Sequence, residues 1–355
     1  MENKLLPSYE KILVTGGLGF IGGALISKLL ENTQANIFNL DKFGYASDSK
    51  RIEEKISFLN LSKDRYTFIK ADLYDKYYIE EIISELNPDC VFHLAAESHV
   101  DKSIISPEKF IQSNVVGTFN LLESIKNNWS KMSKSKKNIF RFLHVSTDEV
   151  FGSLGSSGLF NENSAYSPRS PYSASKAASD HIVDAYFHTF GLPILVTNCS
   201  NNYGPWQYPE KFIPLIISKC LNSKNIPIYG DGKNVRDWIY VDDHIDALIL
   251  VMSSGDIGNH YCIGSSEEHT NLEIASIICN FFDDLRPIRM SHSSLISFVE
   301  DRLGHDRRYA IDSSKIKQEL GWSPKHSFPS GIKETINWYY SNPHWANRFS
   351  QIGLN

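Results

Sequence analysis

The chain has 355 residues, of which 41% are hydrophobic and 22% are charged. These proportions are typical of globular proteins and exclude disordered, collagen-like and coiled-coil classes. The chain carries 36 lysines and arginines against 41 aspartates and glutamates, so its formal net charge is −5. This acidic balance argues against nucleic acid as the main partner, because phosphate binding needs a basic surface. At roughly 150 residues per domain, the length predicts about two domains.

The five cysteines are an odd number, lie far apart and fall mostly in apolar stretches. This pattern is typical of reduced thiols and supports neither a disulfide framework nor a zinc site. Glycines break the apolar run that follows Lys11, so we do not interpret that run as a signal peptide. No run reaches the roughly 20 apolar residues of a membrane span. We therefore expect a cytoplasmic protein without a metal and without membrane contact.

Short apolar runs alternate with helical patterns through the first 200 residues. Runs of this kind are typical of strands that are buried on both faces of a parallel sheet. The strand candidates are residues 11–15, 36–41, 66–72, 90–95, 141–146 and 194–198. The pattern predicts an α/β fold with a doubly wound parallel sheet.

The spacing becomes irregular after Tyr203, where proline and glycine interrupt the pattern. Further strand candidates are residues 226–229, 238–241 and 260–263. We expect one domain over residues 1–202 and a smaller, mainly substrate-binding lobe over residues 203–355. Some of the chain of this lobe is expected to cross back to the first domain.

The glycine-rich segment 15–22 follows the first strand candidate and opens an amphipathic helix, as a dinucleotide-binding motif requires. Gly16 permits the tight turn, Gly19 lets a diphosphate approach the backbone, and Gly22 permits close helix packing. The helix N-terminus favours the negative charge of the phosphates. Asp41 ends the next strand candidate, where a carboxylate binds ribose hydroxyls and repels a ribose phosphate. This favours NAD over NADP; the alternative is a glycine-rich turn with Asp41 capping a loop.

Tyr172 and Lys176 are four residues apart, and hence on one face of a helix that Ser170 and Pro171 begin. A tyrosine acts as a base near neutral pH only if its phenolate is stabilised by about 3 pKa units. Lys176 and the charge of a nicotinamide could supply this stabilisation. Alone, such a pair is usually two exposed helix residues, and the upstream glycine motif favours the catalytic interpretation.

Two adjacent carboxylates, Asp148 and Glu149, follow the strand candidate 141–146, at the sheet edge where α/β proteins bind ligands. Both can face one substrate only if the backbone turns after Thr147, because strand neighbours point to opposite sides. Repulsion and burial would then separate their pKa values and make one an acid and the other a base. The alternative is that Glu149 points to solvent and Asp148 caps a loop.

Seven motifs, taken in order along nearly the whole chain, resemble those of the extended short-chain dehydrogenase/reductase family. Within it, the chain resembles the nucleotide-sugar 4,6-dehydratases that act on dTDP-glucose. The motifs are the glycine segment, LAAESHVDKS at 94–103, STDEVFG at 146–152, YSASK at 172–176, NCSNNYGP at 198–205, PEKFIPL at 209–215 and RDWIYVDDH at 236–244. The Asp-Glu pair in STDEVFG is the most specific of these, because related epimerases lack it. The resemblance implies a Rossmann-type sheet of the extended kind and NAD as the cofactor.

The resemblance also implies the reaction, which converts dTDP-glucose to dTDP-4-keto-6-deoxyglucose and water. Carbon 4 is oxidised, water is eliminated across carbons 5 and 6, and the hydride returns to carbon 6. Tyr172 would accept the proton of the carbon-4 hydroxyl, with Thr147 bound to that oxygen and Lys176 tuning the phenol. Glu149 would remove the proton on carbon 5, and Asp148 would protonate the departing hydroxyl.

By the same resemblance, a larger set of residues would contact the ligands. Those expected at NAD are Gly16, Gly19, Phe20, Ile21, Gly22, Asp41, Lys42, Phe43, Gly44, Asp72, Leu73, Leu94, Ala95, Ala96, Glu97, Ser98, Ser113, Tyr172, Lys176 and Asn202. Those expected at the nucleotide sugar are Ser98, Thr147, Asn201, Lys211, Phe212, Pro227, Ile228, Tyr229, Arg236, Asn271, Asp301, Arg302 and His305. Lys211, Arg236 and Arg302 would converge on the diphosphate, which answers the problem of binding an anion to an acidic chain.

Two positions depart from the family pattern: Cys262 stands in place of an asparagine and Leu303 in place of a proline. Neither is a proposed catalytic group, so they affect the expected shape of the nucleotide pocket rather than the chemistry. No substrate contact is expected after Trp345. A homodimer is also implied, through helices at about 106–127 and 171–190 that carry more apolar surface than one sheet face needs.

Two other functions stay open. A UDP-sugar epimerase, decarboxylase or dehydratase of the same fold would share the cofactor site and Tyr172, and an epimerase or decarboxylase would not use Asp148 as an acid. A non-catalytic NAD-binding protein would have no use for the Tyr172, Lys176, Asp148 and Glu149 set.

Overall fold

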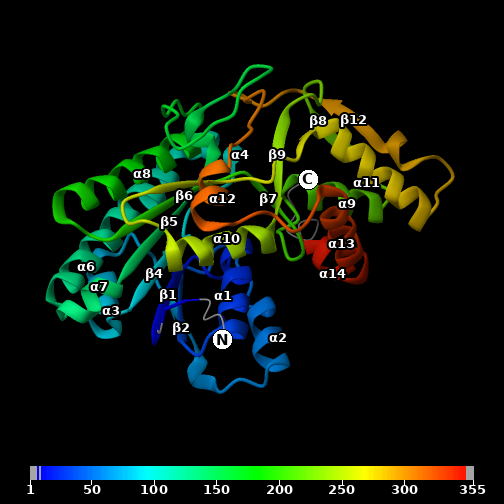
Figure 1. The fold of residues 1–355 in the computed structure, drawn as a ribbon. Helices are drawn as coiled ribbons and strands as arrows, with labels where there is room; N and C mark the ends of the chain where they lie inside the picture. The colour runs from blue at the N-terminus through cyan, green and yellow to red at the C-terminus, as the bar shows by residue number, and fades with distance from the viewer. Residues whose placement is uncertain (1–5, 8, 349–355) are drawn as a thin grey trace.

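The computed structural model describes residues 6, 7 and 9–348 and shows a large parallel sheet with helices on both faces (Figure 1). This sheet has seven strands in the order β10-β6-β5-β4-β1-β2-β3, and every pairing in it is parallel. Its strands are β1 Lys11–Thr15, β2 Asn36–Asp41, β3 Tyr66–Lys70, β4 Cys90–His93, β5 Arg141–Thr147, β6 Ile194–Cys199 and β10 His260–Ile263. The predicted doubly wound parallel sheet is confirmed.

The helices of this part follow the strands in alternation. They are α1 Phe20–Asn32, α2 Lys50–Phe58, α3 Lys76–Leu86, α4 Val100–Ile105, α5 Pro107–Phe110, a π-helical segment Ile111–Val116, α6 Gly117–Lys131, α7 Lys134–Ile139, α8 Pro171–Phe190, α10 Val241–Ser254 and α12 Ser314–Leu320. No described helix is long and apolar enough to cross a membrane.

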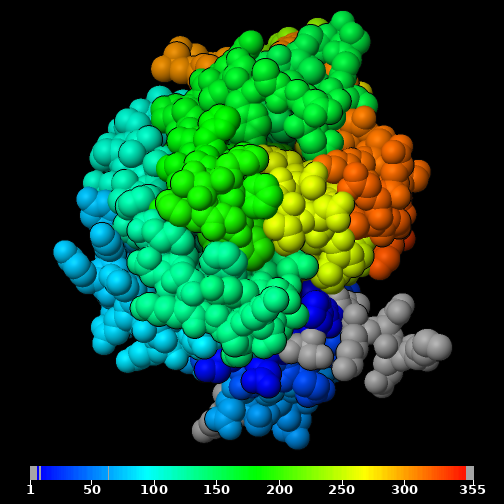
Figure 2. Space-filling view, turned by 60° about the vertical axis from the view of Figure 1, so that its left-hand side comes forward, coloured from blue at the N-terminus to red at the C-terminus, as the bar shows by residue number. Residues whose placement is uncertain are grey.

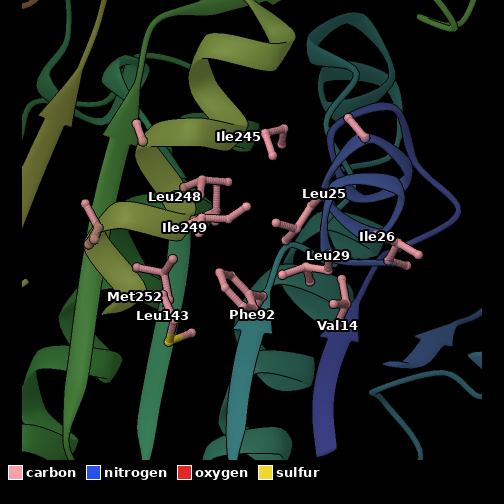
Figure 3. Packing of buried hydrophobic residues seen from close by; sticks show 14 of the residues in the cluster. Val14, Leu25, Ile26, Leu29, Phe92, Leu143, Ile245, Leu248, Ile249 and Met252 are labelled. Carbon is pink, nitrogen blue, oxygen red and sulfur yellow. The ribbon is translucent and has the colours of Figure 1, made fainter. Parts of the chain in front are cut away.

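Alternate residues of one strand serve two separate cores. Ile12 and Val14 of β1 belong to the core under α1 and α10, whereas Leu13 belongs to the core under α3, α6 and α8. Figure 3 shows the first core, in which side chains of α1 and α10 meet above β1, β4 and β5. A strand that is buried on both faces reads as a continuous apolar run, which explains why these strands could be predicted.

A second lobe carries two small sheets and its own apolar core. Its strands are β7 Asn201–Tyr203, β9 Val235–Tyr240 and β11 Glu268–Thr270 in one sheet, and β8 Ile226–Tyr229 and β12 Ile296–Val299 in the other. Its helices are α9 Phe212–Leu221, α11 Asn271–Leu285, α13 Phe328–Ser341 and α14 Pro343–Ala346. In Figure 1 these elements lie at one end of the large sheet.

The chain returns from residues of the small sheets to the large sheet. Strand β10 has the bounds predicted from the sequence, but it pairs with β6 at the edge of the large sheet. Lys315 then donates to the carbonyl of His260 at 2.9 Å, so α12 packs against the same edge. Figure 2 shows the resulting contact between green, yellow and orange parts of the chain on one face.

Candidate active site

A cavity of about 380 Å³ lies at the edge of the large sheet where the parallel strands end. Its wall includes residues at or directly after the ends of β1, β2, β4, β5 and β6, the first turns of α8, and a segment of the second lobe. Open α/β sheets bind their ligands at this edge. The cavity is therefore the candidate site.

The glycine loop after β1 forms a narrow backbone cradle at one end of the cavity. Gly16 has φ +72°, and a Cβ there would lie 2.7 Å from the backbone of Ala95. A Cβ on Gly22 would lie 2.3 Å from the carbonyl oxygen of Gly16. Gly19, the N-cap of α1, lines the cavity, and no side chain caps the helix there. Uncapped amides at a helix N-terminus suit the diphosphate of a dinucleotide, so the chain fits NAD at this end.

Asp41 holds a fixed position at the end of β2. Its carboxylate accepts hydrogen bonds from the amides of Leu18 at 3.0 Å and Phe43 at 2.8 Å, and from the Ser47 hydroxyl at 3.1 Å. A carboxylate has about four acceptor positions, which leaves one for a ribose hydroxyl. Phe43 has φ +60°, its side chain is half exposed and rests near Phe68, and it does not line the cavity. Its contribution at this site is its amide.

The structure brings the other residues expected at NAD to the cavity wall. They are Gly16, Gly19, Phe20, Ile21, Gly22, Asp41, Lys42, Gly44, Asp72, Leu73, Leu94, Ala95, Ala96, Glu97, Ser98, Ser113, Tyr172, Lys176 and Asn202. Strands β3 and β4 end two residues earlier than predicted, because the chain turns there toward the cavity.

Helix α8 carries Tyr172 and Lys176 to the cavity. Ser170 caps the helix through a capping box with Ser173. Lys176 Nζ donates to the carbonyl of Val145 at 3.0 Å, so it is anchored under the site. Burial, and then the charge of Glu149, raise the pKa of Tyr172 well above its ordinary value. The surrounding side chains thus favour the protonated phenol. Stabilisation of the phenolate would therefore need the positive charge of the cofactor in addition to that of Lys176.

The chain turns directly after Thr147, as joint action of the two carboxyl groups requires. A 3₁₀ turn, Asp148–Phe151, follows β5. Thr147 Oγ1 accepts from the Glu149 amide at 3.2 Å and donates to Asp148 Oδ1 at 3.3 Å. Thr147 and Glu149 line the cavity, whereas Asp148 is buried behind them.

The two carboxyl groups have different electrostatic surroundings. Burial raises the pKa of Asp148 well above its ordinary value, and the charges of Glu149 and Asp237 raise it further. Burial also raises the pKa of Glu149, but the positive charges of Arg236, Arg302 and Lys211 oppose the rise. Asp148 therefore suits the role of a proton donor, and Glu149 is the carboxylate that cations stabilise.

The three cations approach Glu149 from the second lobe and its connections. Lys211 lines the cavity and donates to the carbonyl of Ser98 at 3.0 Å. Arg236 is buried, donates to the carbonyl of Asp306 at 2.9 Å and stacks 4.2 Å from the Tyr309 ring. Arg302 pairs with Asp101 at 3.4 Å. Their shared effect on one carboxylate indicates that they converge.

The residues expected at the sugar nucleotide divide into two groups. Ser98, Thr147, Asn201 and Lys211 line the cavity. Outside its wall lie Phe212, Pro227, Ile228, Tyr229, Arg236, Asn271, Asp301, Arg302 and His305. Within this second group, Arg302 and His305 lie 5.9 Å and 6.2 Å from the exposed Tyr229 ring. The Ile228 side chain is completely buried in the core of the second lobe and is not available to a ligand.

Several residues of the wall were not predicted. Trp206, Gln207, Tyr208 and Glu210 line the cavity. The signal that could have found them is their position, since the first three lie between two of the quoted motifs and Glu210 lies within PEKFIPL. Trp345 also lines it and donates from Nε1 to the carbonyl of Gln207 at 3.2 Å. A single tryptophan far along the chain gives no such signal.

The end of the described chain is fixed to the cofactor side of the cavity. Arg348 forms an ion pair with Asp48, which follows the Asp41 loop, and its guanidinium lies 4.6 Å from the Trp345 ring. Within residues 6, 7 and 9–348, no group of three or more histidines, cysteines or carboxylates could hold a metal ion.

Comparisons with known proteins agree with this geometry. The family model described as GDP-mannose 4,6 dehydratase matches residues 13–335. The dTDP-glucose 4,6-dehydratase of Salmonella typhimurium is 49% identical over 346 residues, covering 95% of this chain and 94% of that protein. The dTDP-glucose 4,6-dehydratase 1 of Escherichia coli K12 is 48% identical over 346 residues, covering 95% of this chain and 94% of that protein.

Solved structures show the same fold. DesIV, the dTDP-glucose 4,6-dehydratase of Streptomyces venezuelae crystallised with NAD and TYD, is 38% identical with a TM-score of 0.84, covering 94% of this chain and 98% of that one. The UDP-glucose 4-epimerase of Thermotoga maritima is 26% identical with a TM-score of 0.81, covering 94% and 99%. The identity to the dehydratases is higher, and the Asp148–Glu149 pair is present here. The chain belongs to the dTDP-glucose 4,6-dehydratase family of extended short-chain dehydrogenases/reductases.

Proposed function

We propose that the chain converts dTDP-glucose to dTDP-4-keto-6-deoxyglucose and water, with NAD held in the cavity throughout the cycle. The observation that carries this proposal is the position of Asp148 and Glu149 directly after β5, with Glu149 on the same cavity wall as Tyr172. Elimination of water needs one proton donor and one proton acceptor. The surroundings of Asp148 favour its protonated form, whereas nearby cations favour the ionised form of Glu149.

In the first step, Tyr172 accepts the proton of the hydroxyl on carbon 4. NAD bound in the cavity would supply the hydride chemistry, as the acceptor of hydride from carbon 4 and the source of hydride for carbon 6. Thr147 lines the cavity beside Tyr172 and holds the same sugar oxygen through its hydroxyl. Lys176 follows Tyr172 by about one helical turn and is anchored on the Val145 carbonyl, and its positive charge favours the phenolate when the proton is transferred.

In the second step, the new ketone at carbon 4 makes the hydrogen on carbon 5 acidic. Glu149 faces the cavity, removes that proton and gives it back to carbon 5 when carbon 6 receives hydride. Asp148 donates its proton to the hydroxyl that leaves carbon 6 as water. Burial, and then the charges of Glu149 and Asp237, raise the pKa of Asp148 and so favour its protonated form.

The diphosphate of the substrate is placed by the three cations around Glu149. One opposite-charge pair about 4 Å apart contributes roughly 4 kcal/mol at an effective dielectric constant of 20. Convergence of Lys211, Arg236 and Arg302 thus lets an acidic chain bind a nucleotide diphosphate sugar. Tyr229, next to Arg302 and His305, offers an exposed ring to the base.

Incubation with dTDP-glucose, and separately with UDP-glucose and with UDP-glucuronic acid, tests this function. We expect mass spectrometry to show the loss of one water from dTDP-glucose. A product of unchanged mass with inverted carbon 4 would identify an epimerase, and loss of carbon dioxide from the corresponding uronic acid would identify a decarboxylase. Either product, or no reaction with dTDP-glucose, would contradict the proposal.

We also propose a homodimer through the π-helical segment, α6 and α8. Ile111, Phe119 and Phe190 are 46%, 40% and 45% exposed, respectively. The teal and green parts of the chain that contain these helices lie at the surface in Figure 2. Other apolar residues of these helices, Phe110, Leu122, Ile125, Val183 and Tyr186, are buried within the subunit.

The division into an NAD-binding domain at 1–202 and a mainly substrate-binding lobe at 203–355 is likewise a proposal. It is supported by the separate core of the second lobe, and residues 1–5, 8 and 349–355 lie outside the described residues. Location in the cytoplasm stays a prediction, which the five free cysteines support.

A further inference from the structure

Helix α8 carries a third ionisable residue on the face that presents Tyr172 and Lys176. Asp180 follows Lys176 by four residues, so the three side chains form one row along the helix. Asp180 is completely buried and does not line the cavity. Nothing in the proposed reaction uses it, and a buried carboxylate needs a physical explanation.

Asp180 accepts four hydrogen bonds. The donors are His144 Nε2 at 3.1 Å, Ser146 Oγ at 2.8 Å, the Tyr166 hydroxyl at 2.9 Å and Asn198 Nδ2 at 3.3 Å. Three of these bonds reach Oδ2 and one reaches Oδ1, so donors contact both oxygens and favour the ionised carboxylate. Burial alone would raise the pKa of Asp180, but the bonds from His144 and Ser146 and the charge of Lys176 lower it overall. Asp180 is therefore an anion in the core.

Lys176 is a cation whose charge acts on this anion. Its Nζ lies 3.4 Å from His144 Nε2, the ring nitrogen that is bonded to Asp180. Burial lowers the pKa of His144 to about 4, so the ring is neutral at pH 7 and lies between the two opposite charges. Its Nε2–H donates to Asp180, so the 3.4 Å approach of the Lys176 ammonium group is a contact rather than a hydrogen bond. Burial also lowers the pKa of Lys176, and the charge of Asp180 opposes that change.

We propose that Asp180 is a positioning residue that supplies the buried counter-charge of Lys176. Through it, the ammonium group stays charged and anchored on the Val145 carbonyl beneath Tyr172. An ammonium group buried without such a partner loses its proton instead. The kinetic part of this inference rests on the proposed function, whereas the charge pairing does not.

Other ionisable groups that face this pair do not replace Asp180. They are His93 of β4, His144 of β5, Cys199 of β6, His260 of β10, Tyr166 of the loop before α8, and Tyr172 and Asp184 of α8. Burial lowers the pKa of His93 and raises the pKa of Cys199 to about 12, so both are neutral at pH 7. Asp184 is paired with His260 at 2.8 Å.

A double-mutant cycle on stability tests the charge pairing without any reaction. Asp180→Asn leaves a lone buried cation, Lys176→Met leaves a lone buried anion, and the double variant removes both charges. If the two substitutions acted independently, their effects on the unfolding equilibrium constant would multiply. We expect the constant of the double variant to be at least tenfold smaller than that product. The matched cycle of Lys176→Met with Asp184→Asn should be additive. Additivity in the Asp180 cycle would overturn the proposal.

The pH profile of turnover tests the link to Lys176. Asp180→Asn should move the alkaline limb to lower pH by at least one unit, because Lys176 then loses its proton more easily. Asp184→Asn should keep the wild-type activity and limb, and Tyr166→Phe, which keeps the Asp180 charge, should keep the limb. A folded Asp180→Asn variant with an unchanged limb would overturn the proposal.

If Asp180→Asn does not fold, recovery of folding in the double variant with Lys176→Met supports the pairing, and failure of the double variant to recover overturns it. If the wild-type protein does not act on dTDP-glucose, the proposed function fails and the stability cycle still decides on the charge pair.

Discussion

Asp148 and Glu149 are neighbours in the chain, yet only Glu149 reaches the cavity, while Asp148 lies buried behind it with Oδ2 free of any partner among the described residues. The 3₁₀ turn that Thr147 caps produces this difference. Two similar groups thus obtain different proton affinities from one backbone feature.

Replacing either carboxyl group should impair elimination more than binding. Asp148→Asn and Glu149→Gln should each lower turnover by about 10² to 10⁴, the usual contribution of a positioned acid or base. Reduced cofactor should accumulate in a single turnover, because oxidation at carbon 4 depends on Tyr172. Stopped-flow absorbance and titration with the nucleotide sugar measure both effects, with the exposed Glu85→Gln as control. Wild-type turnover in either variant would refute these roles.

The purified protein should already contain NAD and should turn over without added NADH or metal. The cofactor is regenerated in each cycle, and within residues 6, 7 and 9–348 no metal-ligand cluster occurs. Acid extraction followed by chromatography would detect the nucleotide. A requirement for a divalent cation that persists after treatment with a chelator and repurification would contradict this expectation.

Stability should fall as the pH drops below about 6.5, in part because His244 is buried and neutral. Its Nδ1 is bonded to Asn202 at 2.8 Å, and burial lowers its pKa to about 3. Between these values the unfolded chain binds the proton and the folded chain does not, so each pH unit costs about 1.4 kcal/mol. Urea unfolding of His244→Gln should show a pH slope smaller by that amount. The exposed His188→Gln should keep the wild-type slope, and equal slopes in all three proteins would exclude this explanation.

Sedimentation at micromolar concentration should show a species near twice 40.3 kDa. Phe119→Asp should shift this species toward the monomer, because it places a charge in the proposed apolar interface. Phe58→Asp, at a residue that is 81% exposed on α2, serves as the matched control. A wild-type monomer that stays fully active on dilution would contradict the dimer.

The parts of the fold that local pattern dictates could be predicted from the sequence. Strands β1, β2, β8 and β10 have the predicted bounds, because apolar runs and turn residues mark them. The pairing partner of β10 could not be predicted, since an apolar run shows that a strand is buried but not where. The burial of Ile228 could not be predicted for the same reason. Its side chain enters the core of the second lobe, while that of Tyr229 stays exposed, and only the packing of β8 decides this.

The parts of the candidate site that depend on the spacing of residues along one helix could be predicted. Tyr172 and Lys176 reach the cavity because four residues make one helical turn. The outward position of the Phe43 side chain could not be predicted. It follows from a left-handed backbone conformation, which the sequence does not indicate at a phenylalanine. The contact of Lys176 with Val145 also depends on how α8 packs on β5, which no local pattern encodes.

The place of Trp345 has a consequence for the order in which the molecule becomes complete. A nascent chain that has left the ribosome as far as residue 202 holds the glycine loop, Asp41 and Tyr172. It still lacks the wall formed by residues 206–211, and Trp345 emerges much later. The large sheet also gains its edge strand β10 only from residues 260–263. The wall of the cavity is therefore complete only after residue 345 has emerged, and partial chains that already display the glycine loop should hold the cofactor weakly.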